Sequence, residues 1–267
     1  MTSSTSYPNS INPLARVGRV FLNFLAAVGR LSLFTWAGIA CAARGPRYPK
    51  QIGRMMIEIG YFSLPVIGLT AIFTGGVLAL QSYSGFSRFS AESSIPIVVV
   101  LSITRELGPV LAGLMVAGRI GAAFAAEIGT MRVTEQIDAL VTLSTNPFKY
   151  LIFPRLLAGA LMLPCLVFIA DIVGVFGGYV VSVHTLNFAA EPYINNTWSF
   201  LERFDVVSGL IKASVFGFII SLMGCYHGYH SKGGAQGVGT ATTNAVVSSS
   251  ILILFSNYFL TKLFFAV

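Results

Sequence analysis

The sequence contains few charged residues. Asp, Glu, Lys and Arg make up 10% of its 267 residues, whereas hydrophobic residues make up 55%. Soluble domains carry about 25% charged residues, so this chain has too few to cover a surface that faces water. The apolar content also excludes an intrinsically disordered chain. An integral membrane protein remains, and the length allows roughly four to seven helical spans of about 20 residues each.

Motifs for catalysis and metal binding are also missing. The three cysteines have no CxxC spacing, so we expect them to be small buried hydrophobic residues. The glycine-rich segment 233–239 lacks the GxxxxGKS or GxxxxGKT order of a phosphate-binding loop. His227 and His230 have no third metal ligand near them in the sequence. We therefore expect no catalytic residue, metal or cofactor in this chain, and the sequence outside the spans is too short for an ATPase domain.

Acidic residues are absent from the N-terminal part of the chain, where seven basic residues precede the first acid, Glu58. By the positive-inside rule, this pattern places the N-terminus in the cytoplasm. A helix predicted for residues 14–43 has a Leu and Phe stripe on one side and a basic stripe on the other, formed by Arg16, Arg19 and Arg30. Such a helix is typical of the membrane interface. A poorly hydrophobic first span is the alternative, and nucleic-acid binding is disfavoured because the segment leads directly into membrane spans.

Five apolar stretches define the remaining topology, at residues 59–83, 95–129, 148–183, 206–229 and 240–267. We therefore expect an all-α integral membrane protein with two parts. Residues 1–58 form a cytoplasmic tail and an interfacial helix, and residues 59–267 form a five-helix transmembrane domain. Five spans from a cytoplasmic N-terminus place the C-terminus on the outer side.

Three charged residues interrupt these spans deep in the membrane. Arg105 and Glu106 lie roughly 15 Å from the outer end of their helix, and Lys212 lies roughly 9 Å into a later span from the same side. Each such charge costs about 2.5–3.5 kcal/mol, so something must offset that cost, and a pair between Glu106 and Lys212 is geometrically possible. Pro109 lacks the N–H that bonds the carbonyl of Arg105 in a regular helix, so a kink is expected there. Two interpretations stay open: a pair that fixes helix register, and a polar patch that lines or gates a substrate path.

A polar segment at residues 127–146 separates the second and third spans on the predicted cytoplasmic side. Four charged residues lie in it: Glu127, Arg132, Glu135 and Asp138. Its composition alone favours a solvated connecting helix, and a docking element for a partner is the alternative.

Several stretches of the sequence resemble the MlaE/YrbE permease family: RELGPV at 105–110, AGRIGAAFAAEIGTMRVTEQIDAL at 117–140, PR at 154–155 and ATTNAVVSSS at 241–250. The resemblance covers most of the chain and is most specific between Arg105 and Leu140. It implies the membrane subunit of an ABC transporter that moves phospholipid between the inner and outer membranes of Gram-negative bacteria. Such a subunit contributes to the lipid asymmetry of the outer membrane.

The resemblance also implies partners and a location. Two copies form the membrane core, and a separate cytoplasmic ABC ATPase supplies the site for ATP and Mg²⁺. An MCE-domain lipid-binding protein lies on the periplasmic side. A small STAS-domain protein accompanies some of these ATPases. The chain would lie in the bacterial inner membrane, with its C-terminus in the periplasm. Residues 127–146 then correspond to the coupling segment, and the residues expected to act in ATPase coupling are Glu127, Arg132, Glu135, Gln136 and Asp138.

The sequence departs from the family pattern after the EQIDAL element. Family members commonly carry an acidic residue where this chain has Val141, and an Asp-Pro pair where it has Asn146 and Pro147. Two fewer negative charges change the ATPase contacts expected of the segment, but not its role. The competing function is a stand-alone secondary transporter or channel for a lipid-like or small amphipathic substrate. It would need a coupling-ion site, for which the spans offer few acids beyond Glu106 and Asp171.

Overall fold

The computed structural model describes residues 13–43 and 48–265, and this part of the chain is all-helical, without strands. Six helical stretches are long and apolar enough to cross a membrane: Gly18–Cys41, Pro49–Phe89, Glu92–Val133, Phe148–His184, Arg203–Tyr229 and Gly234–Phe264. The expected multi-pass, all-α architecture is therefore confirmed. The number of candidate spans is one higher than expected, because the N-terminal helix also has the length and composition of a span.

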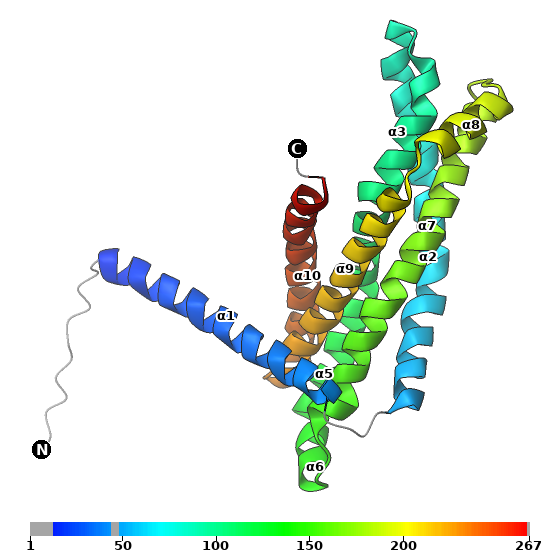
Figure 1. Ribbon diagram of the computed structural model, residues 1–267. Coiled ribbons are helices and arrows are strands. Elements are labelled where there is room, and N and C mark those ends of the chain that lie inside the picture. Colours follow the sequence, from blue (N-terminus) through cyan, green and yellow to red (C-terminus); the bar gives the residue numbers. More distant parts are fainter. Residues whose placement is uncertain (1–12, 44–47, 266–267) are drawn as a thin grey trace, which may run out of the picture.

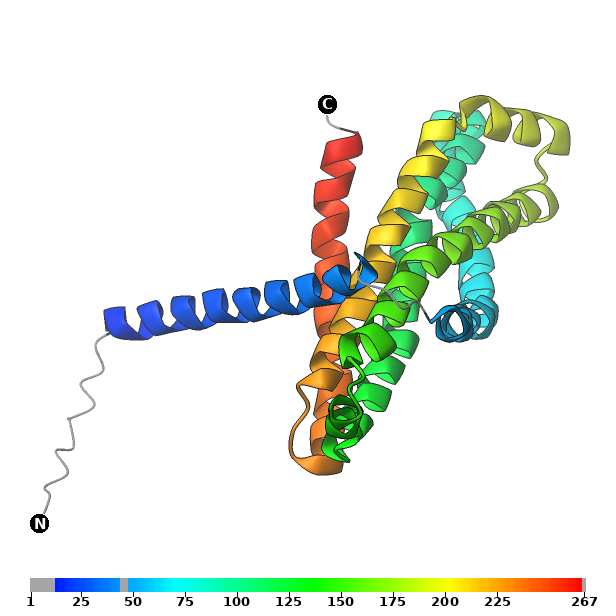
Figure 2. The ribbon, with the colours of Figure 1, turned by 60° about the horizontal axis from the view of Figure 1, so that its bottom comes forward.

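This N-terminal helix, α1 (Pro13–Ala43), extends away from the other helices, and only its C-terminal part reaches them (Figure 1). Figure 2 shows α1 crossing the direction of the bundle from a second viewpoint. Arg19 and Arg30 are exposed, whereas the side chain of Arg16 lies outside the described residues. Phe34 anchors the helix, since its ring is buried against Phe148 and Tyr226, with ring centroids 5.2 and 5.4 Å away.

The bundle is built on close contact between α2 (Pro49–Phe86) and α7 (Phe153–His184), which run side by side in Figure 1. A Cβ atom added to Gly75 would overlap the carbonyl oxygen of Gly174, and one on Gly177 would overlap that of Ile72. Small residues thus let the two backbones touch, as is common between helices in lipid. The boundary expected between residues 58 and 59 lies inside α2.

The second predicted span is a helical column interrupted by two π-helical turns. In chain order its segments are α3 (Ile95–Ser102), η3 (Ile103–Leu107), α4 (Gly108–Val116), η4 (Ala117–Gly121) and α5 (Ala122–Val133). The backbone N–H of Gly108 bonds to the carbonyl of Ile103, five residues back. Where a kink was predicted near Pro109, the structure has the π turn η3, which ends two residues before the proline.

The connections lie at the two ends of the bundle. At one end α6 (Gln136–Thr142) and η5 (Phe148–Ile152) join α5 to α7, and at the other lie η1 (Ser87–Phe89), η2 (Glu92–Ser94) and α8 (Ala190–Phe200), as Figure 1 shows for α6 and α8. The last two helices are α9 (Arg203–Tyr229) and α10 (Gly234–Phe264). The stretch between the predicted spans 148–183 and 206–229 contains α8 and the start of α9.

The cysteines differ from the expectation that all three are buried. Cys225 is buried, Cys41 is half-buried and Cys165 is exposed on α7. The exposed face of a membrane helix contacts lipid instead of water, so a small apolar residue there carries no penalty.

Candidate functional site

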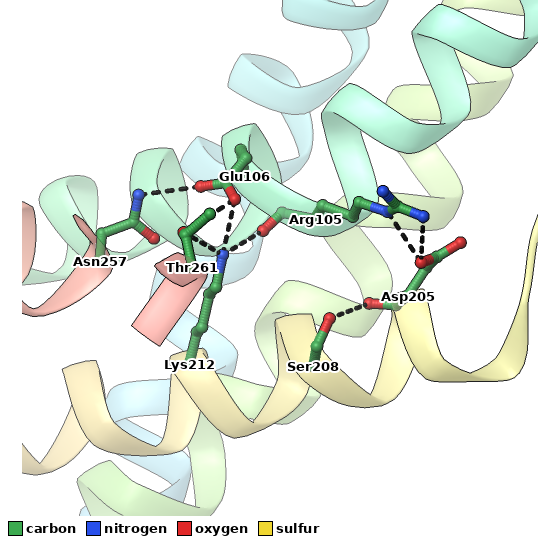
Figure 3. Close-up of polar contacts among 7 residues, drawn as sticks. All are labelled: Arg105, Glu106, Asp205, Ser208, Lys212, Asn257 and Thr261. Atoms are coloured by element: carbon green, nitrogen blue, oxygen red, sulfur yellow. Dashed lines mark hydrogen bonds and ion pairs between the residues drawn. The ribbon is translucent and has the colours of Figure 1, made fainter. Parts of the chain in front are cut away.

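A cluster of charged and polar side chains joins η3, α9 and α10 in the half of the bundle that faces α8 (Figures 1 and 3). Its centre is Lys212 on α9, whose side chain is fully buried. Lys212 Nζ donates to Glu106 Oε1 at 2.7 Å, to the backbone oxygen of Arg105 at 2.9 Å and to Thr261 Oγ1 at 2.8 Å. These three bonds use all three donors of the ammonium group. The predicted ion pair between Glu106 and Lys212 is therefore present.

Glu106 is also held by two groups on a further helix. Its Oε2 accepts from Asn257 Nδ2 at 2.9 Å, and its Oε1 accepts from the Thr261 hydroxyl at 2.9 Å, both on α10. The Glu106 side chain retains 36% exposure, whereas Lys212 has none, so the cluster is accessible from the carboxylate side. Sequence reasoning missed Asn257 and Thr261. Placing an uncharged polar residue in a span costs less free energy than placing a charged one, so the sequence alone does not demand a partner for it.

Arg105 makes the second ion pair of the cluster, with Asp205 at the start of α9. Its Nε and Nη2 both lie 2.7 Å from Asp205 Oδ1. The other carboxylate oxygen, Oδ2, accepts the backbone N–H of Glu202 at 3.2 Å in a capping box, and Asp205 is 1% exposed. The Arg105 guanidinium carbon lies 4.6 Å from the ring centroid of Phe265. Sequence reasoning missed Asp205, although an acidic pair three residues apart before an apolar run signals a helix start.

The cluster as a whole is electrically balanced. It contains two cations and two anions within the span region: Arg105, Lys212, Glu106 and Asp205. Intramembrane charges are tolerated when they are paired in this way. Arg105 is also 34% exposed, and a guanidinium presents donors in a planar fork that matches phosphate and carboxylate. The arrangement can therefore hold four charges inside a membrane and offer one of them to an anionic ligand.

The predicted coupling segment lies at the opposite end of the bundle. Arg132 Nη1 and Asp138 Oδ1 form an ion pair of 2.7 Å across the turn between α5 and α6. Glu135 forms that turn in the left-handed conformation, with φ at 61°, and its side chain is exposed, as is that of Gln136. Ile137 is buried and anchors the short helix to the bundle. The segment thus presents charged groups outward from a fixed position.

Glu127 differs from the other predicted coupling residues, because it pairs with a helix of the bundle. Its Oε2 lies 2.7 Å from Nη2 of Arg155 on α7. The Arg155 side chain is 1% exposed, donates to the carbonyl of Leu151 at 2.7 Å and has its guanidinium carbon 5.3 Å from the ring centroid of Phe124. Sequence reasoning placed Glu127 in the predicted coupling segment and did not pair it with Arg155.

Comparison with known proteins places the chain among permeases. Residues 52–263 match the family model described as Permease MlaE. A "Probable ABC transporter permease protein" of Rickettsia felis is 60% identical over 257 residues, which cover 96% of this chain and 99% of the relative. A similarly named protein of Synechocystis sp. is 45% identical over 79% of this chain and 80% of its own length. The "Intermembrane phospholipid transport system permease protein MlaE" of Haemophilus influenzae is 32% identical over 96% of this chain and 98% of its own length. The chain therefore belongs to the MlaE permease family.

Proposed function

We propose that this chain is the membrane subunit of an ATP-driven transporter that moves phospholipid between the inner and outer membranes. The observation that carries the proposal is the charge-balanced cluster of Arg105, Asp205, Glu106 and Lys212 inside a bundle of membrane helices. The name of the Haemophilus relative, an intermembrane phospholipid transport permease, supports the choice of substrate. ATP and Mg²⁺ bind to a separate ATPase chain, and this subunit itself is not catalytic.

The cluster contacts the lipid headgroup or controls the passage of lipid through the bundle. A phospholipid carries an anionic phosphate on apolar acyl chains, so it needs a cation beside an apolar wall. Arg105 supplies the cation, because Asp205 engages its Nε and Nη2 and a third of the side chain stays exposed. Exposed apolar side chains of the neighbouring helices supply the wall, for example Met115 on α4 and Phe255 on α10.

Two copies of the chain enclose the lipid cavity between their helices, and the coupling segment transmits ATP-driven motion to them. Closure of the ATPase pair moves α6 through contacts with Arg132, Glu135, Gln136 and Asp138. Glu127 serves the same coupling from inside the bundle, since its pair with Arg155 connects the end of α5 to α7. Movement of α6 is thereby passed to helices that also reach the cluster.

The orientation in the inner membrane follows from this role. The α6 end faces the cytoplasm, with the N-terminus, and the α8 end faces the periplasm, with the C-terminus. Helix α1 lies in the cytoplasmic interface, which is supported by its direction across the bundle and by the exposure of Arg19 and Arg30 (Figure 2). An MCE-domain protein binds at the α8 end, and a STAS-domain protein accompanies the ATPase.

The experiment that tests the function is reconstitution with labelled phospholipid. The chain is purified with its ATPase, placed in donor vesicles and supplied with the MCE-domain protein and acceptor vesicles. Lipid transfer that requires ATP and is inhibited by vanadate supports the proposal. Gradient-driven flux of lipid or ions through the purified chain alone would contradict it and favour a secondary transporter or channel.

A further inference from the structure

Asp171, halfway along α7, is a buried acid without a partner. It is 5% exposed, and neither carboxyl oxygen has a hydrogen-bond partner among the described residues. Its Oδ1 lies directly against Gly108, the first residue of α4, where an added Cβ atom would overlap it. The carboxyl group therefore fills the space that the glycine leaves at the junction of η3 and α4.

The helices packed around Asp171 bring no free cation to it. Helix α4 has no titratable residue, and α2 has no Asp, Glu, Lys, Arg or His between Glu58 and its end. On α7 itself, Arg155 and His184 are 16 and 13 residues away, which corresponds to roughly 24 and 20 Å along the helix.

The cations of the neighbouring helices are engaged elsewhere. Arg105 on η3 pairs with Asp205, and Lys212 on α9 pairs with Glu106. Arg119, one π turn further along the column, donates to the backbone oxygen of Glu58 at 2.6 Å and to the Ser63 hydroxyl at 2.8 Å on α2. Each of these three cations thus has partners other than Asp171.

An ionised carboxylate in this position would have neither a counter-charge nor a donor. Burying such an ion costs far more than burying the neutral acid, and a carboxyl group under these conditions takes up a proton. We infer that Asp171 is a proton-binding site inside the bundle and is held as the neutral carboxylic acid while α7 packs against Gly108. Ionisation then requires α7 and α4 to separate.

The bound proton gives Asp171 a hydrogen to donate. The carbonyl oxygen of Ile103 lies beside the same point, 2.9 Å from a Cβ position built on Gly108, and a carbonyl accepts two hydrogen bonds. Both atoms lie against Gly108, so the neutral acid lies beside the π turn that carries Arg105 and Glu106. A cavity of about 20 Å³, lined by both Gly108 and Ala170, borders this contact and has room for one water molecule.

Solid-state NMR of the wild-type chain in lipid, labelled with ¹³C at aspartate carboxyl groups, tests the inference directly. The sequence contains only three aspartates, Asp138, Asp171 and Asp205. Asp138 pairs with Arg132 and Asp205 pairs with Arg105, so each of these two carboxylates has a counter-charge that Asp171 does not have. We expect one of the three carboxyl signals to have the chemical shift of a neutral acid at pH 7.

Two variants assign that signal. Asp171→Asn, which keeps the shape and a donor, should remove it, and the exposed Asp138→Asn control should leave it unchanged. Three ionised signals in the wild-type chain at pH 7, or a neutral signal that persists in Asp171→Asn, would overturn the inference. The measurement needs neither an ATPase nor lipid transfer, so its outcome is independent of the proposed function.

Discussion

Lys212 bonds to the backbone carbonyl of Arg105 through its Nζ, at 2.9 Å, across the contact between α9 and η3. That carbonyl has no regular helical donor, because residue 109 is proline. The same ammonium neutralises Glu106. One lysine thus compensates both for a partly exposed carboxylate inside a span and for a break in the helical hydrogen bonds.

Removal of this lysine should destabilise the bundle. Lys212→Met keeps the length of the side chain but removes the cation beside Glu106 and the donor to the Arg105 carbonyl, so that only Asn257 and Thr261 still donate to Glu106. We expect a loss of about 3 kcal/mol, at the lower end for a broken buried pair because Glu106 is partly exposed. The free energy of unfolding in detergent measures it. In the double variant with Glu106→Gln, part of that loss should be recovered, and an unchanged or larger loss would contradict a direct pair.

The backbone contact between α2 and α7 gives a second prediction. Gly75→Ala places a methyl group on the Gly174 carbonyl and should cost about 1–3 kcal/mol through overpacking. Gly68→Ala, on the same helix, is a matched control, because nothing lies within 4 Å of its added Cβ atom. Thermal unfolding of the two variants separates these effects. Equal stability of both would show that the helices do not touch at Gly75.

The pair of Glu127 and Arg155 is unequally buried, and this predicts unequal effects of mutation. Glu127→Ala leaves a fully buried arginine without its counter-charge and should cost about 3 kcal/mol or more. Arg155→Leu removes the buried charge and leaves a half-exposed carboxylate that water can solvate, so its cost should be smaller. The free energies of unfolding of the two variants test this order. The reverse order would contradict the burial of Arg155.

The coupling segment should contribute to ATPase binding more than to stability. The ion pair of Arg132 and Asp138 is exposed, and such pairs contribute only about 0–1 kcal/mol. Asp138→Ala should therefore leave the unfolding temperature nearly unchanged but reduce co-purification of the partner ATPase. Glu191→Ala, an exposed acid on α8 at the other end, is the control. If Asp138→Ala co-purifies the ATPase in normal amounts, Asp138 does not contribute to the interface.

The residues of the cluster that the sequence predicted are those whose charge would cost much free energy if it were left unpaired in the membrane. Glu106 and Lys212 both stand inside apolar spans, roughly 15 and 9 Å from the same side, so a pair between them offsets the cost of leaving either charge alone. Asp205 was missed because the polar stretch before it reads as a loop, whereas the structure begins α9 at Arg203. Asn257 is uncharged, so it lacks the large free-energy cost of an unpaired charge in a span from which a partner could be predicted.

Tertiary packing decided the other features that sequence reasoning missed. The pair of Arg155 and Glu127 depends on how α5 and α7 approach each other near the α6 end of the bundle, which local patterns do not encode. Pro109 shows that a donor is missing, but the choice of a π turn over a simple kink depends on the neighbouring α9 and α7. The span count differed because α1 is apolar enough for a span, while its basic stripe is typical of an interface.

The central claim is that the cluster acts in ATP-driven lipid transfer, and transfer between donor and acceptor vesicles by the reconstituted ATPase complex tests it most directly. Each of the variants Arg105→Ala, Glu106→Gln and Lys212→Ala should reduce the ATP-dependent rate at least about tenfold, which corresponds to ~1.4 kcal/mol, at equal amounts of assembled complex. Full transfer by all three variants, at normal expression, would show that the cluster only fixes helix register.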